Sequence, residues 1–204
     1  MNWLAHTLLS SKSIEYQLGN LLADPMKGRW WPGVSDELVA GFQMHAAIDS
    51  FTDRNPWVLK SKARLGEKGY LKGVVIDIVY DYFLSQRWDE YVGLERQSFL
   101  TAFYVEALPA ASSYPKPAND FIERLVRVKV FSQYHQWDGI CEALYRLDKR
   151  LSPRILAKEK ASDYIAQLSK QRQALDADFQ HFFPELIDYF KRGSRLKEDD
   201  YWLY

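Results

Sequence analysis

The sequence has little of several features on which common classes of protein depend. It has one cysteine, Cys141, which cannot form a disulfide within the chain, and we expect a cytoplasmic protein because thiols stay reduced there. No segment approaches the roughly 20 consecutive apolar residues of a membrane helix, so we expect no membrane insertion. Basic and acidic residues number 27 each, giving a formal net charge of zero, and we expect no nucleic-acid binding driven by overall charge.

Motifs of several familiar enzyme classes are also missing. The chain has no phosphate-binding loop of the G-x-x-x-x-G-K-[ST] kind and no G-x-G-x-x-G fingerprint. Cys141 and His135 are six residues apart, too far to face each other on one helix, and no acid obviously completes a triad with them. The opening segment "MNWLAHTLLSSKS" has neither a basic leader nor a small-residue cleavage site, so we interpret it as part of the fold.

The spacing of apolar residues predicts the fold class. A chain of 204 residues suits one domain with a substantial core, so we expect a single domain over 1–204. Apolar residues recur at spacings of three and four, and no segment alternates for long enough to indicate a sheet. The prediction is an all-α, single-domain helical bundle. Its expected helices cover about 3–9, 36–51, 56–65, 70–88, 96–108, 118–134 and 137–150, with a long last helix that Ser152 caps, from Pro153 to a break at Pro184.

Two pairs of polar residues fall on predicted helices at a spacing of four. His45 and Asp49 lie in "GFQMHAAIDSFTD" among mostly apolar neighbours, and residues four apart share one face of a helix. Asp77 and Asp81 lie in "YLKGVVIDIVYDYFLSQRW", which is so apolar that we expect it to be the central helix. A buried carboxylate needs a partner. A divalent cation would satisfy both aspartates, and so would an arginine or a set of backbone donors.

The first 25 residues add His6 and Asp24, each at the end of a run of small and apolar residues. Mixed histidine and aspartate ligands suit Mn²⁺, Fe²⁺ or Mg²⁺ better than a structural zinc ion, which favours cysteine. A metal site is therefore one interpretation of these two residues and the two pairs. Helix caps, salt bridges and core hydrogen bonds are the other interpretation, because pairs at this spacing occur by chance in many helical proteins.

Positive charge is concentrated in one part of the chain. The segment 146–160, "RLDKRLSPRILAKEK", contains six basic residues and two acidic ones. It could bind an acidic partner, or it could be a solvated helix face, and both interpretations stay open at this point.

Four segments, taken together, resemble one known family. "MNWLAH", "GNLLADPMKG", "HAAIDSFTD" and "DIVYDYFLSQRW" have the order and about the spacing found in the acyl carrier protein phosphodiesterases. The resemblance covers almost the whole chain, and its specific part is 1–88. That family in turn resembles the all-helical HD-domain phosphohydrolases without their adjacent His-Asp doublet, so the bundle is expected to be a distorted HD-like one.

The resemblance implies an activity, a metal and a set of residues. The activity is hydrolysis of the phosphodiester that joins 4'-phosphopantetheine to a serine of holo-acyl carrier protein, which gives the apo protein and free 4'-phosphopantetheine. The metal is a divalent ion, most often Mn²⁺, with Mg²⁺ or Fe²⁺ as alternatives. The expected catalytic residues are Asp24, His6 and Asp49, with Asp24 expected to be essential. The metal ligands that the resemblance implies are Asp24, His45, Asp49, Asp77 and Asp81.

One departure from the family concerns the substrate phosphate. Family members often have a basic residue directly after the histidine of the third segment, whereas Ala46 follows His45 here. Lys27 or Arg54 could make that contact instead. Because acyl carrier proteins are acidic, the basic segment 146–160 gains a purpose as a docking patch. The residues expected to dock the carrier are Arg146, Lys149 and Arg150.

Two other functions stay open on the sequence alone. One is an HD-like phosphohydrolase that acts on a nucleotide or another small phosphodiester, which would need the metal but no docking patch. The other is a non-catalytic helical binding module whose carboxylates are caps and ion pairs. For that module, metal would not stabilise the native state.

Overall fold

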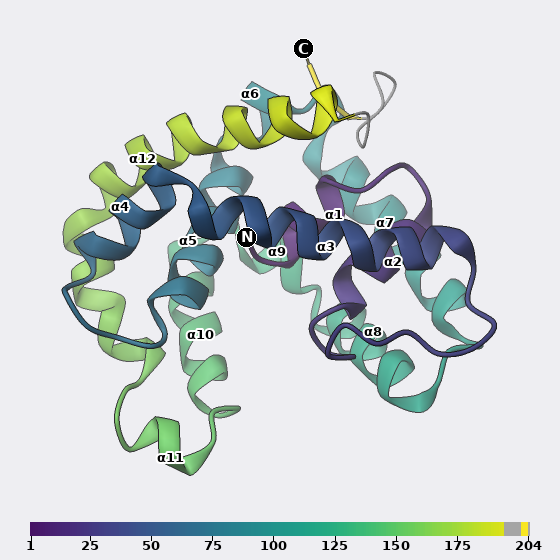
Figure 1. The fold of residues 1–204 in the computed structure, drawn as a ribbon, viewed down its shortest axis with the longest axis horizontal. Helices are drawn as coiled ribbons and strands as arrows, with labels where there is room; N and C mark the ends of the chain where they lie inside the picture. The colour runs from purple at the N-terminus through teal and green to yellow at the C-terminus, as the bar shows by residue number, and fades with distance from the viewer. Residues whose placement is uncertain (194–200, 204) are drawn as a thin grey trace.

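A computed structural model describes residues 1–193 and 201–203, and Figure 1 shows their fold. Within these ranges the regular elements are helices, and the one β pairing is an isolated bridge between Val92 and Trp202. The all-α prediction is confirmed. No helix in the described ranges is long and apolar enough to cross a membrane. The elements are α1 (Trp3–Leu8), α2 (Ile14–Leu22), α3 (Asp36–Arg54), α4 (Pro56–Arg64), α5 (Lys72–Gln86), α6 (Trp88–Tyr91), α7 (Arg96–Ala111), α8 (Lys116–Val128), α9 (Val130–Gln133), α10 (Trp137–Asp148), α11 (Pro153–Leu156), the 3₁₀ helix η1 (Ala161–Tyr164) and α12 (Ile165–Arg192).

Polar side chains fix where the first long helices begin. The hydroxyl of Ser35 accepts a hydrogen bond from the Leu38 N–H at 3.2 Å and so caps α3. Ser13 caps α2 in the same way, through the Tyr16 N–H. Each cap satisfies a backbone N–H that the helix itself leaves unpaired and contributes about 1 kcal/mol. These two caps set the start of the helices that flank the candidate site.

The helix α5 is the central helix of the bundle, as predicted. It packs against α1, α4, α10 and α12, and its residues from 75 to 85 are buried apart from Asp77, which is partly exposed. The fully buried ring of Tyr80 contacts Phe179 and Phe182 of α12, with centroids 5.2 and 5.4 Å apart. In Figure 1, α12 runs along the top of the view and α3 runs across the middle. The contact with α1 places the aspartates of α5 next to the first residues of the chain.

The end of the chain differs from the prediction of one long helix from Pro153. That prediction is wrong, because α11 ends at Leu156 and the chain turns through η1 before α12 begins. The turn is held by Asp148, whose carboxylate accepts hydrogen bonds from the N–H of Ala161 at 2.6 Å and of Ser162 at 3.2 Å. Those backbone groups are 13 and 14 residues away in sequence, so local capping signals could not reveal the contact.

The predicted break at Pro184 is also wrong, because α12 continues through it. A proline inside a helix costs about 3 kcal/mol. The neighbouring Phe183 and Leu186 are fully buried, and burial of each stabilises the helix by about 1.5–3 kcal/mol, which offsets that cost.

The predicted helix 118–134 is divided into α8 and α9 at Lys129, which has a left-handed backbone conformation with φ of 48°.

Two glycines let α2 and α3 approach with their backbones in contact. A Cβ atom at Gly19 would lie 2.1 Å from the backbone oxygen of Leu38, and one at Gly41 would lie 2.2 Å from that of Tyr16. Both separations are far below van der Waals contact, so any larger residue would force the helices apart. The approach places the C-terminal end of α2 beside the middle of α3, where the candidate site lies.

We expect Gly41→Ala to lower the free energy of unfolding by about 1–3 kcal/mol, the usual cost of overpacking. Urea unfolding of the purified variant measures this. Gly73→Ala in α5 is the matched control, because its Cβ would meet only the flexible end of Lys62, at 3.7 Å. In a helix, that control should be neutral or stabilising by up to about 1 kcal/mol. Equal effects of the two substitutions would contradict the close packing of α2 on α3.

Candidate functional site

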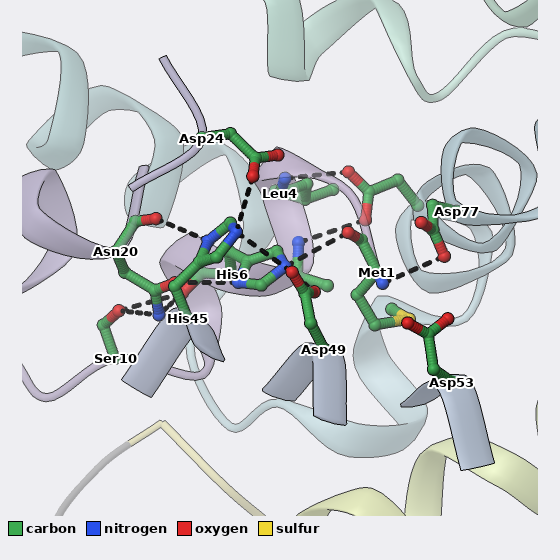
Figure 2. A network of polar contacts seen from close by, with 12 residues as sticks. Met1, Leu4, His6, Ser10, Asn20, Asp24, His45, Asp49, Asp53 and Asp77 are labelled. Carbon is green, nitrogen blue, oxygen red and sulfur yellow. Dashed lines mark hydrogen bonds and ion pairs between the residues drawn. The ribbon is translucent and has the colours of Figure 1, made fainter. Parts of the chain in front are cut away.

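Four of the predicted site residues come together from three segments of the chain. His6 lies on α1, Asp24 follows the end of α2, and His45 and Asp49 lie one turn apart on α3. The Nε2 atom of His45 is 3.2 Å from Asp24 Oδ1 and 3.1 Å from Asp49 Oδ2. The Nε2 atom of His6 is 3.2 Å from Asp49 Oδ1. Figure 2 shows the two imidazole rings side by side, with the two carboxylates next to their nitrogens.

The site has a buried side and an open side. The two imidazole rings stack with centroids 4.1 Å apart and an interplanar angle of 21°. Both histidines are buried, whereas the side chains of Asp24 and Asp49 are 73% and 43% exposed. The nitrogens are therefore fixed within the fold, while the carboxylates face the side from which a substrate can approach.

Asn20 orients both rings, although it is not among the site residues predicted from the sequence. Its side-chain Oδ1 accepts a hydrogen bond from Nδ1 of His6 at 2.7 Å, and its backbone oxygen accepts one from Nδ1 of His45 at 2.8 Å. Its Nδ2 donates to the backbone oxygen of His6 and to the hydroxyl of Ser10, which sets the orientation of the amide. The signal in the sequence was an asparagine in the apolar segment "GNLLAD", four residues before Asp24.

The hydrogen bonds of His6 fit a cation. With Nδ1 donating to Asn20, the neutral ring has a lone pair at Nε2. That atom faces the Met1 carbonyl oxygen at 3.1 Å and Asp49 Oδ1 at 3.2 Å, and neither oxygen can donate a hydrogen bond. Three acceptors that converge need a proton or a metal ion between them. Burial and then the nearby charge of His45 lower the pKa of His6, which disfavours the proton, so the donor set fits a metal ion.

The electrostatics of the neighbouring residues keep both carboxylates ionised. Burial alone would lower the pKa of His45, but hydrogen bonds to Asp24 and Asp49 outweigh burial and raise the pKa to about 9. Burial alone would raise the pKa of Asp49, but the hydrogen bond from His45 and the close contact with His6 hold that pKa well below its usual range. The hydrogen bond from His45 also lowers the pKa of Asp24. At neutral pH both aspartates can therefore serve as ligands or proton acceptors, whereas a metal ion that binds Nε2 of His45 has to displace the proton that the two carboxylates favour there.

His6, His45 and Asp49 form a group that could hold a metal ion. Each offers one ligand atom, and these atoms all lie within 4.8 Å of one another. The contacts from Nδ1 to Asn20 are the kind of hydrogen bond that orients metal-bound histidines in general. The structure thus places His6 among the possible ligands, although the resemblance implied a catalytic role for it. Asp24 approaches the group at its edge, through His45 alone.

Asp77 and Asp81 lie next to this group, but their oxygens contact other groups. Asp81 is fully buried and accepts hydrogen bonds from the N–H groups of Leu4 at 2.8 Å and Ala5 at 3.1 Å, in the first turn of α1. Burial raises its pKa to about 7, against the opposite effect of these two bonds. Asp77 accepts from the amino group of Met1 at 3.0 Å. Backbone donors were one of the partners that the sequence left open for these carboxylates.

The predicted substrate-binding residues fall in three places. Lys27 is exposed in the turn that follows α2, where its N–H donates to the backbone oxygen of Asp24 at 3.0 Å. Arg54 donates to the backbone oxygen of Ser50 and lines a different cleft, beside Phe51 and Glu185. The other three lie at the end of α10 and just after it: Arg146 and Arg150 line a cleft that also contains Asp24, and Lys149 is exposed outside that lining.

We expect Asn20→Leu to weaken Mn²⁺ binding by about 10- to 100-fold, the usual effect of removing a group that orients a metal ligand. It should also destabilise the fold by about 1–3 kcal/mol for each buried polar group that it leaves unpaired. Gln17→Leu is the control, because Gln17 is a buried amide on the same helix that donates to the Tyr201 hydroxyl, away from the histidines. Mn²⁺ titration of both variants measures the difference. Equal affinities would show that Asn20 does not orient the histidines.

Comparison of the sequence with known protein families shows which family matches the part of the chain that carries the site. The family model described as acyl carrier protein phosphodiesterase matches residues 1–186, which include all the residues of the site. The chain belongs to the acyl carrier protein phosphodiesterase family. The family function is hydrolysis of holo-acyl carrier protein to the apo protein. The family resemblance stated from the four sequence segments is therefore confirmed.

Curated relatives with the same description match this chain over nearly their whole length. The acyl carrier protein phosphodiesterase of Pectobacterium atrosepticum is 26% identical over 193 residues, which cover 94% of this chain and 98% of the relative. Those of Photorhabdus laumondii and Serratia proteamaculans are each 28% identical, over 92% and 94% of this chain and 94% and 98% of the relative, respectively. No solved structure matches the chain, so the HD-like character of the bundle stays a prediction.

Proposed function

We propose that this protein hydrolyses the phosphodiester between 4'-phosphopantetheine and a serine of holo-acyl carrier protein, with Mn²⁺ held by His6, His45 and Asp49. The observation that carries the proposal is the convergence of two buried histidines and an ionised aspartate, beside a cleft, in a member of this family. The carrier protein is the proposed partner. No second function has a specific observation in its favour.

The residues of the site have separate parts in this proposal. His6, His45 and Asp49 hold the ion, and a set of nitrogen and oxygen ligands suits Mn²⁺ or Fe²⁺ better than Mg²⁺, which prefers oxygen alone. When bound, the ion would supply positive charge against the phosphate oxygens and lower the pKa of a water molecule. Asp24 contacts His45 through Oδ1, which leaves Oδ2 to orient the attacking water and accept its proton.

We propose a positioning role for Asp77 and Asp81 in place of the metal-binding role implied by the resemblance. Asp81 accepts from two N–H groups in the first turn of α1, and His6 is the next residue after that pair. A carboxylate at this end of a helix is also favoured by the helix dipole. Through these contacts, α5 would hold His6 in register with His45.

Among the basic residues, Lys27 is the better candidate for a contact with the substrate phosphate. Its backbone N–H is bonded to Asp24, so it shares the turn that carries the proposed proton acceptor. Arg54 is directed to Ser50 and lines another cleft. We therefore assign the phosphate contact to Lys27 and leave Arg54 out of the proposed site.

The test of the reaction is intact-mass spectrometry of holo-acyl carrier protein incubated with the purified protein. We expect loss of the mass of one phosphopantetheine group with Mn²⁺ present and no loss with excess chelator, because the ionised site needs a cation to receive an anionic phosphodiester. Restoring Mn²⁺ after chelation should restore the loss. An intact holo-carrier after incubation with the folded, Mn²⁺-loaded protein would reject this substrate.

A further inference from the structure

A cleft of about 760 Å³ opens beside the candidate site, between α8 and α10. Its volume is within the range of about 300–1,000 Å³ that is usual for ligand pockets. Asp24 and Pro25 line it, so the cleft adjoins the group formed by the two histidines through the contact between Asp24 and His45. In Figure 1, α8 lies to the lower right and α10 to the lower left, and both lie below α3 in this view.

Four arginines line this α8–α10 cleft. Arg124 and Arg127 are three residues apart on α8 and so share one face of that helix. Arg146 lies near the end of α10 and Arg150 two residues beyond that end, and both line the cleft. None of the four guanidinium groups forms a hydrogen bond or an ion pair with a residue in the described part of the chain, although that of Arg150 lies 6.0 Å from the centre of the Trp3 ring. The protein leaves four positive charges around one opening, and such a charge pattern attracts anionic partners.

The cleft also has an apolar lining that is open to solvent. Val74 of α5 and Val128 at the end of α8 line it and are 36% and 42% exposed. Trp3 and Phe121 add partly buried aromatic surface. An occupant that suited only the arginines would leave these side chains in water. The cleft therefore suits a ligand that combines a long, uncharged part with anionic groups nearby.

We propose that the α8–α10 cleft binds holo-acyl carrier protein in two parts: the apolar lining takes the pantetheine arm, and the four arginines pair with acidic side chains of the carrier. This inference rests on the proposed function, and it adds α8 to the docking surface expected from 146–160. With the arm in the cleft, the phosphodiester at its end lies toward Asp24. Recognition is then directed at the prosthetic group, which keeps the phosphate after hydrolysis, as well as at the carrier protein.

The experiment is binding to the full-length, Mn²⁺-loaded protein of two unreactive probes, each of which carries one half of the substrate. Neutral pantetheine carries the arm, and apo-acyl carrier protein carries the acidic surface. Ligand-observed NMR and calorimetry, respectively, give the two dissociation constants. The wild-type protein should bind both, and the affinity for apo-carrier should fall steeply with salt. Absence of binding of either probe to the wild-type protein overturns the proposal, and since neither reading needs turnover, this outcome is distinct from failure of the proposed function.

Two sets of variants then test the apolar lining and the arginines of the cleft separately. Val128→Trp should weaken pantetheine binding at least tenfold and leave apo-carrier binding unchanged, which also shows that the variant is folded. The pair Arg124→Glu with Arg127→Glu should weaken apo-carrier binding at least tenfold and leave pantetheine binding unchanged. Controls are Val105→Trp, on the exposed surface of α7, and the pair Lys68→Glu with Lys170→Glu, both exposed and outside the cleft. Variants that bind both probes as their controls do would overturn the proposal.

Discussion

Asp49→Asn should remove both metal binding and turnover. Asp49 is the carboxylate between the two histidines, with one oxygen facing each Nε2 atom. Asparagine keeps the size of the side chain but loses the negative charge that offsets a divalent cation. Because such an ion supplies several kcal/mol of transition-state stabilisation, and 1.36 kcal/mol is a factor of ten in rate, we expect kcat/KM for holo-carrier to fall by about 10³-fold or more.

The Mn²⁺-induced rise in melting temperature is a second measurement of the effect of Asp49→Asn. A ligand at 100 times its dissociation constant stabilises the native state by about 2.7 kcal/mol, so Mn²⁺ should raise the melting temperature of the wild-type protein and not that of Asp49→Asn. Asp53→Asn is the control on the next turn of α3, where Asp53 is exposed and pairs with Lys62 at 2.8 Å. If Asp49→Asn responded to Mn²⁺ as Asp53→Asn does, Asp49 would not be a ligand.

Sequence spacing predicted the one contact of the site that lies within a single helix, between His45 and Asp49. His45 and Asp49 are four residues apart, and a helix alone brings them to 3.1 Å. The contact between Asp24 and His45 has another cause, because it depends on the backbone approach of α2 to α3. Gly19 and Gly41 permit that approach, and nothing in the pattern of apolar residues distinguishes them from other glycines.

The sequence limited the possible partners of Asp77 and Asp81 to a few kinds but did not distinguish between them. Their place in an apolar helix required partners, and a cation, an arginine or backbone donors all met that requirement. The backbone donors of Asp81 come from residues 77 and 76 positions earlier in the chain. A contact at that separation follows from how α1 packs on α5, which is a property of the whole bundle. The same limit explains why Asn20 was missed, since its significance is that it contacts two histidines on different helices.

Asp24→Asn should slow the reaction without weakening metal binding. Asp24 lies at the edge of the metal-binding group with its side chain 73% exposed, and it contacts the group only through His45. Removal of a general base usually costs about 10²–10⁴-fold in rate. We therefore expect kcat to fall by that factor, while the dissociation constant for Mn²⁺ and the Mn²⁺-induced rise in melting temperature stay near the wild-type values.

Chemical rescue distinguishes a proton acceptor from a structural residue at this position. Asp24→Ala leaves space at an exposed site, so added formate should restore part of the lost rate if the missing group is a carboxylate that accepts a proton. Asp49→Asn, which loses the ion itself, should not respond to formate. A loss of Mn²⁺ affinity in Asp24→Asn as large as that in Asp49→Asn would place Asp24 among the ligands instead, as the family resemblance implied. Because Asp24 also lines the cleft, retained metal binding with lost turnover would locate the reacting phosphodiester between the histidine pair and the α8–α10 cleft.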